Sequence, residues 1–444
     1  MSSRPDTHCL QEALDLRRRG SDEIANLQLT LLKRHLQHAG TLPFYRRIFQ
    51  GADFNPNTIT SLSDLAELPL TERKDIDDSP EAFTSTSVPA IADIALTSGT
   101  TGHPLVVPYT VHDLERLAFN EEVAFSSAGL GKNDRVLLTV TLDRCFIAGF
   151  AYFWGLVRLG VTAIRSGPGQ PARQWQLIER LRPTALLGVP SFLLGLARWG
   201  TENGYNPRTA GIKTIITIGE PIRKADFTPT RLGQFLEDAW GAKVFSSYGV
   251  TELETAFGDC PSACGAHIHP EMMIVEIVDD HGRILPDGLP GEVVATPLGV
   301  EGLPLVRFRT GEIARVHTAP CSCGWNTARL GPIEGRLSQR LKYKGTTLYP
   351  GMIFHALQEI PGATDAYIEV RQSFDLSDEV TVVIGADEQG PDQRKVEDTL
   401  QAHLRVGPKV IFKNRSEVRA RMHNDLDRKP RNFFDLRTES QTGS

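Results

Sequence analysis

The fold of this chain is decided by the stretch DRVLLTVTL at 134–142, which is followed by CFIAGFAYFWGLVRLG at 145–160. The first run is short and rich in branched aliphatic residues, as buried strands are, and the second has a helical pattern. Three further strand-like runs follow: TALLGVP (184–190), KTIITIGE (213–220) and AKVFSSYG (242–249). Strands that alternate with helices predict an α/β fold with a largely parallel sheet and helices on its faces. Ligands of such folds bind beyond the carboxyl ends of the strands.

The regions on either side of this core have different patterns. Residues 10–40 carry apolar side chains at helical spacing and predict an amphipathic helical region. From residue 272, the alternating runs MMIVEIV and GEVVATPL flank a segment rich in turn residues, which predicts antiparallel strands. After Gly335, the runs YIEVRQ and EVTVVIGA followed by a helical pattern over 392–405 predict a small α+β unit.

These patterns predict two domains. We expect a large N-terminal domain over residues 1–334, with mostly parallel strands, helices and a β-rich subdomain. A small α+β C-terminal domain is expected over residues 335–444.

Composition excludes several classes of protein. The 444 residues include 48 basic and 54 acidic side chains, a net charge of −6, so the positive field that a nucleic acid partner requires is missing. The longest apolar stretch, 183–197, contains Pro190 and is shorter than the roughly 20 residues that span a bilayer. The first twenty residues carry charges where a signal peptide needs an apolar centre. We therefore expect a cytoplasmic protein without a nucleic acid or membrane partner, and homodimer formation stays open.

The sharpest local signal is LTSGTTGHPL at 96–105, a loop rich in glycine and hydroxyl groups that follows the strand-like run IADIAL. Glycines allow the backbone to approach an anion, and successive N–H and hydroxyl groups donate to phosphate oxygens. The alternative interpretation is a flexible surface turn. The loop alone does not decide between them.

Further motifs in the chain favour a phosphate-binding loop over a surface turn. They are LPFYRRIF (42–49), LPLTERKDI (68–76), GEPI (219–222), SSYGVTE (246–252), PLVRFRTGEI (304–313), Gly335-Arg336, and Lys429 within DRKPR. Together with the glycine-rich loop, this ordered set resembles the acyl-adenylate-forming superfamily, and more closely the phenylacetate–CoA ligase family. The resemblance extends from about residue 40 to residue 437. It implies that a carboxylate attacks the α-phosphate of ATP, expels pyrophosphate, and is then passed as an acyl group to a thiol.

The resemblance also assigns roles to individual residues. Those implied to hold the β- and γ-phosphates are Thr97, Ser98, Gly99, Thr100, Thr101 and Gly102. Those implied to lie along adenine and ribose are Gly219, Glu220, Pro221, Ser247, Tyr248, Gly249, Glu312 and Arg336. Thr251 and Lys429 are implied to contact the α-phosphate, and Glu252 to bind Mg²⁺, a cation that prefers carboxylate and phosphate oxygens.

Four positions depart from the family pattern. His103 and Gln339 replace a common lysine and a hinge aspartate, Glu312 replaces an aspartate, and Arg428 replaces a glycine. A neutral histidine supplies less charge to a phosphate loop. Two candidates also have ordinary structural interpretations: Thr251 as a helix cap and Arg336 as a surface ion-pair residue.

The sequence indicates the residues of the acyl pocket less clearly than those of the nucleotide site. Phe146, Phe150, Phe192 and Tyr248 are aromatic positions that would line an aryl slot, although such residues more often belong to an ordinary core. We expect a flat aromatic monocarboxylate such as a benzoate, anthranilate or phenylacetate. Two alternative functions stay open: transfer to the phosphopantetheine of a carrier protein, and a degenerate nucleotide-binding regulator. ATP, Mg²⁺ and CoA are the expected cofactors.

Four of the six cysteines form two pairs that are close in sequence, Cys260 with Cys264 and Cys321 with Cys323. Six cysteines are too few for a disulfide framework at this length, and four thiolates suit tetrahedral zinc. The resemblance adds His267 as a competing ligand. We expect a structural Zn²⁺ site, with free thiols or a redox role as alternatives.

Overall fold

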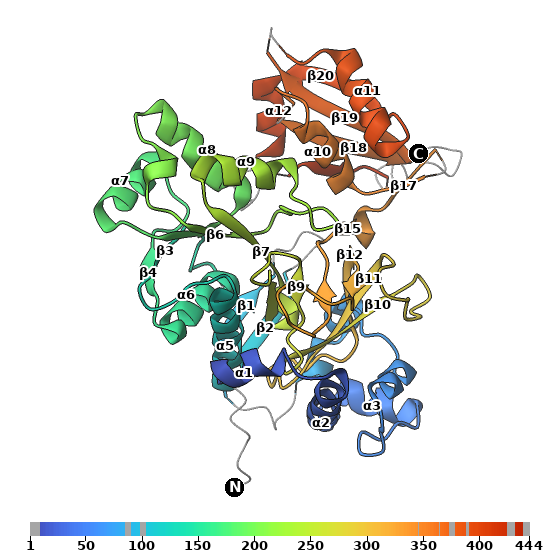
Figure 1. The fold of residues 1–444 in the computed structure, drawn as a ribbon. Coiled ribbons are helices and arrows are strands. Elements are labelled where there is room, and N and C mark those ends of the chain that lie inside the picture. Colours follow the sequence, from blue (N-terminus) through green and yellow to red (C-terminus); the bar gives the residue numbers. More distant parts are fainter. Residues whose placement is uncertain are drawn as a thin grey trace. The chain divides into compact units, whose positions relative to one another are not determined.

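The structure is a computed structural model that describes residues 9–84, 90–97, 104–344, 346–363, 365–372, 378–387, 390–423 and 431–437. The chain divides into two compact units (Figure 1). Unit 1 comprises residues 1–310 and 314–332, and unit 2 comprises residues 311–313 and 333–444. The predicted α/β class is confirmed.

Unit 1 contains a six-stranded sheet in the order β4-β3-β5-β6-β7-β8. Its strands are β3 (Arg135–Leu138), β4 (Thr162–Arg165), β5 (Ala185–Gly188), β6 (Thr214–Ile218), β7 (Lys243–Val250) and β8 (Thr255–Gly258). All neighbouring pairs are parallel except β7 with β8, which confirms the largely parallel sheet. The helices that alternate with these strands are α5 (Val111–Ser127), α6 (Ile147–Leu159), α7 (Pro171–Leu181), α8 (Pro190–Glu202) and α9 (Arg231–Trp240).

Both faces of this sheet are covered, because successive side chains of a strand point to opposite faces. One face packs against α7, α8 and α9 through Leu137, Leu186, Ile215, Val244, Trp175 and Trp240. The other packs against α5 and α6 through Val136, Leu187, Ile216, Phe245, Phe125 and Leu156. Apolar residues on both faces explain why these strands read as continuous hydrophobic runs in the sequence.

The rest of unit 1 consists of helices and antiparallel strands. The predicted N-terminal helical region is confirmed as α1 (Leu10–Leu16) and α2 (Ser21–Ala39), and α3 (Pro43–Gly51) and α4 (Arg73–Asp78) follow. β1 (Ile91–Leu96) pairs antiparallel with β2 (Val106–Thr110). The predicted antiparallel strands are confirmed as β10 (Met273–Val278) and β11 (Gly291–Pro297), next to β12 (Phe308–Ala314). A small sheet is formed by β9 (Ala266–His267), β13 (Val316–His317) and β14 (Arg329–Leu330).

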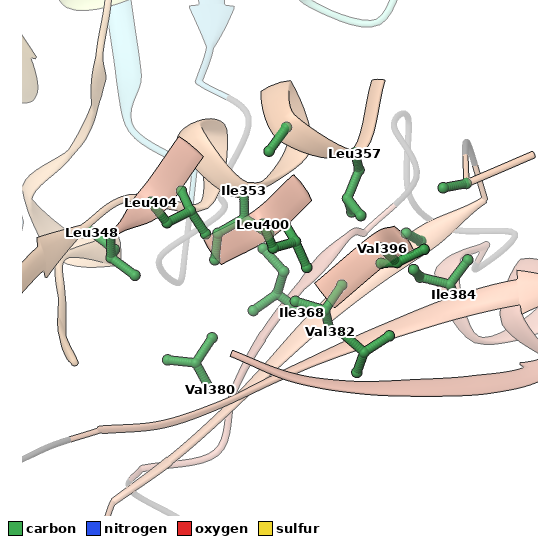
Figure 2. Packing of buried hydrophobic residues seen from close by; sticks show 14 of the residues in the cluster. Leu348, Ile353, Leu357, Ile368, Val380, Val382, Ile384, Val396, Leu400 and Leu404 are labelled. Atoms are coloured by element: carbon green, nitrogen blue, oxygen red, sulfur yellow. The ribbon is translucent and has the colours of Figure 1, made fainter. Parts of the chain in front are cut away.

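Unit 2 is an α+β unit with a four-stranded sheet in the order β20-β19-β18-β21. The strands are β18 (Ala366–Gln372), β19 (Asp378–Ala386), β20 (Lys409–Asn414) and β21 (Phe433–Asp435), and the helices are α10 (Pro350–Gln358), α11 (Gln393–Leu404) and α12 (Arg415–Met422). Figure 2 shows α10 and α11 packed on one face of the sheet through Ile353, Leu357, Val396 and Leu400. Glu312 and Ile313 of β12 pair with β15 (Gly335–Arg336), and β16 (Leu341–Tyr343) pairs with β17 (Thr346–Leu348).

Candidate active site

The motif SSYGVTE lies at the carboxyl end of β7, where a parallel sheet presents its ligand-binding edge. A buried ion pair fixes this strand: the Arg223 Nε donates to Asp259 Oδ2 at 3.0 Å, and Asp259 accepts the Ser246 N–H at 2.8 Å. Burial raises the pKa of Asp259 in spite of its arginine partner. Tyr248 stacks on Phe257 of β8 with ring centroids 5.8 Å apart. The strand end is therefore held from both sides.

Thr251 and Glu252 form a single 3₁₀ turn directly after β7. The Tyr109 hydroxyl on β2 donates to the Thr251 carbonyl at 3.3 Å, so the β1–β2 hairpin touches this turn. Burial raises the pKa of Tyr109 well above its ordinary value, which keeps its hydroxyl a donor. The Glu252 side chain is only 13% exposed.

The ends of the glycine-rich loop meet at the hairpin formed by β1 and β2. The Thr97 N–H donates to the Leu105 carbonyl at 3.1 Å, and the Leu105 N–H donates to Thr97 Oγ1 at 2.9 Å. We call Leu96, Thr97 and Leu105 the loop base. The Leu96 N–H donates to the Cys145 carbonyl at 3.0 Å, so the loop base lies beside the residues that precede α6. The predicted phosphate contacts Ser98, Gly99, Thr100, Thr101 and Gly102, together with His103, lie outside the described residues.

The loop base and the threonine–glutamate turn meet at one side chain, Arg73 of α4. Its Nη1 lies 3.5 Å from Thr97 Oγ1 and 3.7 Å from Glu252 Oε1. Thr97 and Glu252 are 155 positions apart in the chain, yet a single guanidinium reaches both. The motif LPLTERKDI contains Arg73, but a motif does not reveal where a side chain points, so no role was predicted for this residue.

Gly219, Glu220 and Pro221 follow β6, the strand next to β7. Gly219 has a φ of +84°, a conformation that favours glycine. The Glu220 carboxylate accepts the Ser191 N–H at 2.9 Å and the Ser191 hydroxyl at 2.8 Å at the beginning of α8. Glu220 therefore joins the ends of two neighbouring crossover units.

The predicted aromatic residues fall into two environments. Phe192 on α8 is half-buried and packs against the core of α7, α8 and α9, which favours an ordinary core position. Phe146 and Phe150 are half-buried at the beginning of α6, where the backbone meets the loop base. The Phe150 ring centroid lies 5.9 Å from that of Trp154.

Two predicted ribose contacts occur together in unit 2. Glu312 on β12 pairs in register with Arg336 on β15, and the Arg336 Nε donates to Glu312 Oε1 at 3.2 Å. The arginine side chain is 46% exposed and the glutamate side chain 11%. Gln339 ends the 3₁₀ turn that follows Arg336. Lys429, with Arg428, lies outside the described residues.

Four of the five predicted metal ligands converge in unit 1. The ligand atoms of Cys260, His267, Cys321 and Cys323 all lie within 4.8 Å of one another. Cys260 Sγ is 3.7 Å from Cys321 Sγ, close to the roughly 3.8 Å edge of a tetrahedron with Zn–S bonds of about 2.3 Å. Cys323 Sγ is 3.3 Å from His267 Nε2. The fifth candidate, Cys264, directs its thiol to the Ser262 carbonyl at 3.3 Å and is not part of the group.

The surroundings of this cluster suit a cation. His267 Nδ1 lies 2.8 Å from Thr327 Oγ1, which orients the ring so that Nε2 faces the thiols. Burial lowers the pKa of His267 to about 4, so the imidazole is neutral at physiological pH, the form that ligates metals. Burial raises the pKa of Cys260 to about 12, and a thiol in such a site loses its proton when a cation binds.

The cluster is also tied to the N-terminal helix. The buried Arg17 at the end of α1 contacts Glu271 Oε1 at 3.1 Å and His269 Nδ1 at 2.6 Å. Its guanidinium lies 5.6 Å from the centroid of Trp325, whose ring packs edge-on against His267. The Asn326 N–H donates to the Arg17 carbonyl at 2.7 Å.

The carboxyl end of β7 thus bears the threonine–glutamate turn, and Arg73 lies between this turn and Thr97 at the start of the glycine-rich loop. The family model described as AMP-binding enzyme matches residues 50–300. Phenylacetate-coenzyme A ligase of Thermus thermophilus is 30% identical over 365 residues, 80% of each chain, and that of Pseudomonas putida is 31% identical over 78% of each. The chain belongs to the AMP-binding enzymes and, within them, to the phenylacetate–CoA ligase family.

A solved structure with lower sequence identity to this chain has the same fold. A 2-hydroxyisobutyryl-CoA ligase in the postadenylation state matches with a TM-score of 0.82 and 23% identity, over 95% of this chain and 92% of its own. The protein is thus an AMP-forming acid–CoA ligase, which uses ATP to convert an acid to its adenylate and then to its CoA thioester. Within the described ranges, no helix has the length and apolar character needed to cross a membrane.

Proposed function

We propose that the acid is an aromatic monocarboxylate of the benzoate, anthranilate or phenylacetate type. Support comes from two relatives, the phenylacetate-coenzyme A ligases of Thermus thermophilus and Pseudomonas putida, which match 80% and 78% of this chain. Phe146, Phe150 and Tyr248 are proposed to line the aryl slot, since the two phenylalanines begin α6 beside the loop base. Phe192 is proposed only as a supporting core residue. The protein is proposed to work in the cytoplasm.

The observation that carries the proposed site is the shared contact of Thr97 and Glu252 with Arg73. In the adenylation step, a carboxylate oxygen of the acid forms a bond to the α-phosphorus, and the bond to the β-phosphate breaks to release pyrophosphate. Thr97 and residues 98–102 are proposed to hold the β- and γ-phosphates, and Thr251 to position the α-phosphate. Glu252 would hold Mg²⁺, which supplies charge neutralisation when bound.

The remaining nucleotide contacts are also proposals. Gly219, Glu220 and Pro221 would lie along adenine with Ser247, Tyr248 and Gly249, since both segments end neighbouring parallel strands. Glu312 and Arg336 would contact the ribose hydroxyls, because their ion pair presents a carboxylate and a guanidinium in register. Lys429 is proposed to reach the α-phosphate during adenylation, carried by a mobile C-terminal domain that comprises residues 335–444.

The test is ATP–pyrophosphate exchange with a panel of aromatic acids, followed by addition of CoA to the acids that support exchange. We expect exchange with at least one aryl acid and formation of its CoA thioester. Exchange without CoA-thioester formation would favour a carrier-protein acceptor. ATP or AMP binding without acid-dependent exchange would favour the regulator.

Lys429→Ala tests the proposal that Lys429 acts in adenylation and not in thioester formation. We expect a loss of adenylation by several orders of magnitude, with thiolysis of a supplied acyl-adenylate by CoA largely unchanged. The control is Lys395→Ala, which removes an exposed lysine from α11 of the same unit. Equal loss of both half-reactions would contradict the role.

We also propose that Cys260, His267, Cys321 and Cys323 bind one structural Zn²⁺. The short distances among their ligand atoms and the orientation of His267 by Thr327 support this ligand set over one that includes Cys264. Elemental analysis of freshly purified protein should give about one zinc per chain. Cys321→Ser should lower that value and the thermal midpoint, whereas Cys264→Ser should change neither. Zinc-free wild-type protein would refute the proposal.

A further inference from the structure

Arg73 lies where the two proposed halves of the phosphate site meet. Both carboxylate oxygens of Asp77, one turn later on α4, accept the Arg73 Nε–H at 2.9 Å. This pairing occupies one edge of the planar guanidinium and leaves its Nη1 corner directed toward Thr97 and Glu252. Both of those contacts are longer than the roughly 2.7–2.9 Å of a charge-assisted hydrogen bond.

The segment that carries Arg73 is anchored to the residues at the beginning of β12. The Thr71 N–H donates to the Arg307 carbonyl at 3.0 Å, and the Arg309 N–H donates to the Thr71 carbonyl at 2.9 Å. One residue before Arg73, the N-cap Glu72 forms an ion pair with Arg309 at 3.0 Å. Backbone and side-chain contacts thus fix both residues that precede Arg73 against Arg307 and Arg309 of the same unit.

A guanidinium at this position matches the chemistry of the leaving group. Its fork of N–H donors binds phosphate oxygens, and negative charge accumulates on the pyrophosphate as the bond between the α-phosphorus and the bridging oxygen breaks. The 25% exposure of the Arg73 side chain makes it accessible to a ligand, while partial burial strengthens its electrostatic interactions.

We infer that Arg73 binds the β- and γ-phosphates of ATP and the departing pyrophosphate, as a further substrate-binding residue between the loop base at Thr97 and the acidic Glu252. The inference rests on the proposed phosphate site but adds a residue that the sequence motifs do not assign. In the absence of nucleotide, the same guanidinium neutralises Glu252. Arg73 contributes to adenylation and its reversal, whereas thiolysis of an acyl-adenylate does not involve the β- and γ-phosphates.

The first experiment measures nucleotide affinity and needs no acid substrate. Titration calorimetry compares Mg·ATP and AMP binding to wild-type protein, Arg73→Ala and Lys74→Ala. Lys74 is the adjacent exposed residue of α4 and carries the same charge, so its variant is the matched control. For Arg73→Ala we expect ATP affinity to fall about 10- to 100-fold, the loss of one charged hydrogen bond, with AMP affinity unchanged. Arg73→Lys should restore part of the affinity.

The second experiment follows the two half-reactions. Arg73→Ala should raise the KM for ATP and for pyrophosphate in the exchange assay by a similar factor, while CoA-dependent thiolysis of supplied acyl-adenylate stays within about twofold of wild type. Equal ATP affinity in Arg73→Ala and Lys74→Ala, or a parallel loss of ATP and AMP binding, would overturn the inference. Failure of wild-type protein to catalyse exchange would instead contradict the proposed function and leave the ATP-against-AMP comparison valid. Unchanged thermal midpoints show that the variants fold.

Discussion

Glu121 on α5 predicts a pH-dependent loss of stability in unit 1. Its side chain is buried, and the backbone of α6 packs directly on it, because a Cβ built on Gly155 would lie 2.3 Å from the Glu121 Cβ. Its carboxylate Oε1 accepts a long hydrogen bond from Asn120 Nδ2 at 3.4 Å. Burial in this helix interface raises the pKa of Glu121 from 4.5 to about 8.

The magnitude follows from that shift. Between pH 4.5 and 8 the unfolded chain has lost this proton while the folded chain retains it, so stability is greatest at low pH and falls as the pH rises. At about 1.4 kcal/mol for each unit of pKa, this single carboxyl lowers the free energy of unfolding by about 4–5 kcal/mol above pH 8. Glu121→Gln replaces it with a neutral amide of similar shape and removes this dependence.

The assay is urea unfolding monitored by tryptophan fluorescence, since all five tryptophans lie in unit 1. The buried histidines His35 and His267 have pKa values lowered to about 4, so their titration makes stability rise with pH only up to about pH 6.5. Measurements at pH 6.5–8.5 therefore exclude the contribution of these histidines. We expect the stability advantage of Glu121→Gln over wild type to grow by about 1–1.4 kcal/mol per pH unit between pH 6.5 and 7.5 and to level off as the pH passes about 8. Glu115→Gln, an exposed position on the same helix, should show no such change. Parallel pH profiles of wild type and Glu121→Gln would refute the reasoning.

Three further substitutions test buried contacts of unit 1: a close packing contact, an ion pair and a set of hydrogen bonds. Gly149→Ala on α6 should lower the thermal midpoint sharply, with a cost of about 3 kcal/mol or more, because the new Cβ would lie 1.8 Å from the Thr141 carbonyl oxygen; an unchanged midpoint would contradict this geometry. Glu276→Gln should cost about 3–5 kcal/mol in urea unfolding, because it leaves the buried guanidinium of Arg307 without its anion. Asp113→Asn should cost about 2–4 kcal/mol by the same measurement, because its carboxylate accepts hydrogen bonds from three backbone N–H groups at the beginning of α5 and in the loop at 301–302.

Four strands of the central sheet, β3, β5, β6 and β7, could be predicted because they are rich in apolar residues and alternate with helices. The strands that were not predicted depend on distant partners. β21 is only three residues long, and it pairs in parallel with β18, more than 60 residues earlier in the chain. β8 reverses direction after the SSYGVTE turn, through Glu254 at a φ of +49°. Short segments whose pairing is set by tertiary contacts carry too weak a local pattern to be recognised.

The candidate site could be predicted as residue types but not as contacts. The cysteine spacing indicated a metal site, yet only the structure distinguishes Cys264, whose thiol points to a nearby carbonyl, from the four converging ligands. Glu220 was expected beside adenine on the basis of its motif, and the structure adds its hydrogen bonds to Ser191. Arg73 had no assigned role, because side-chain direction across a tertiary contact is not encoded in local spacing.

The attachment of Arg17 beside the cysteine cluster has a practical consequence for protein engineering. Deletion of the chain through residue 19 would remove the only cation shown to contact the buried Glu271 carboxylate in the described residues, and it would uncover Trp325. A fusion tag ahead of residue 9 leaves these contacts intact. The end of α1 thus supports the residues that flank the cysteine cluster, His269 and Trp325, although they come about 250 to 310 positions later in the chain.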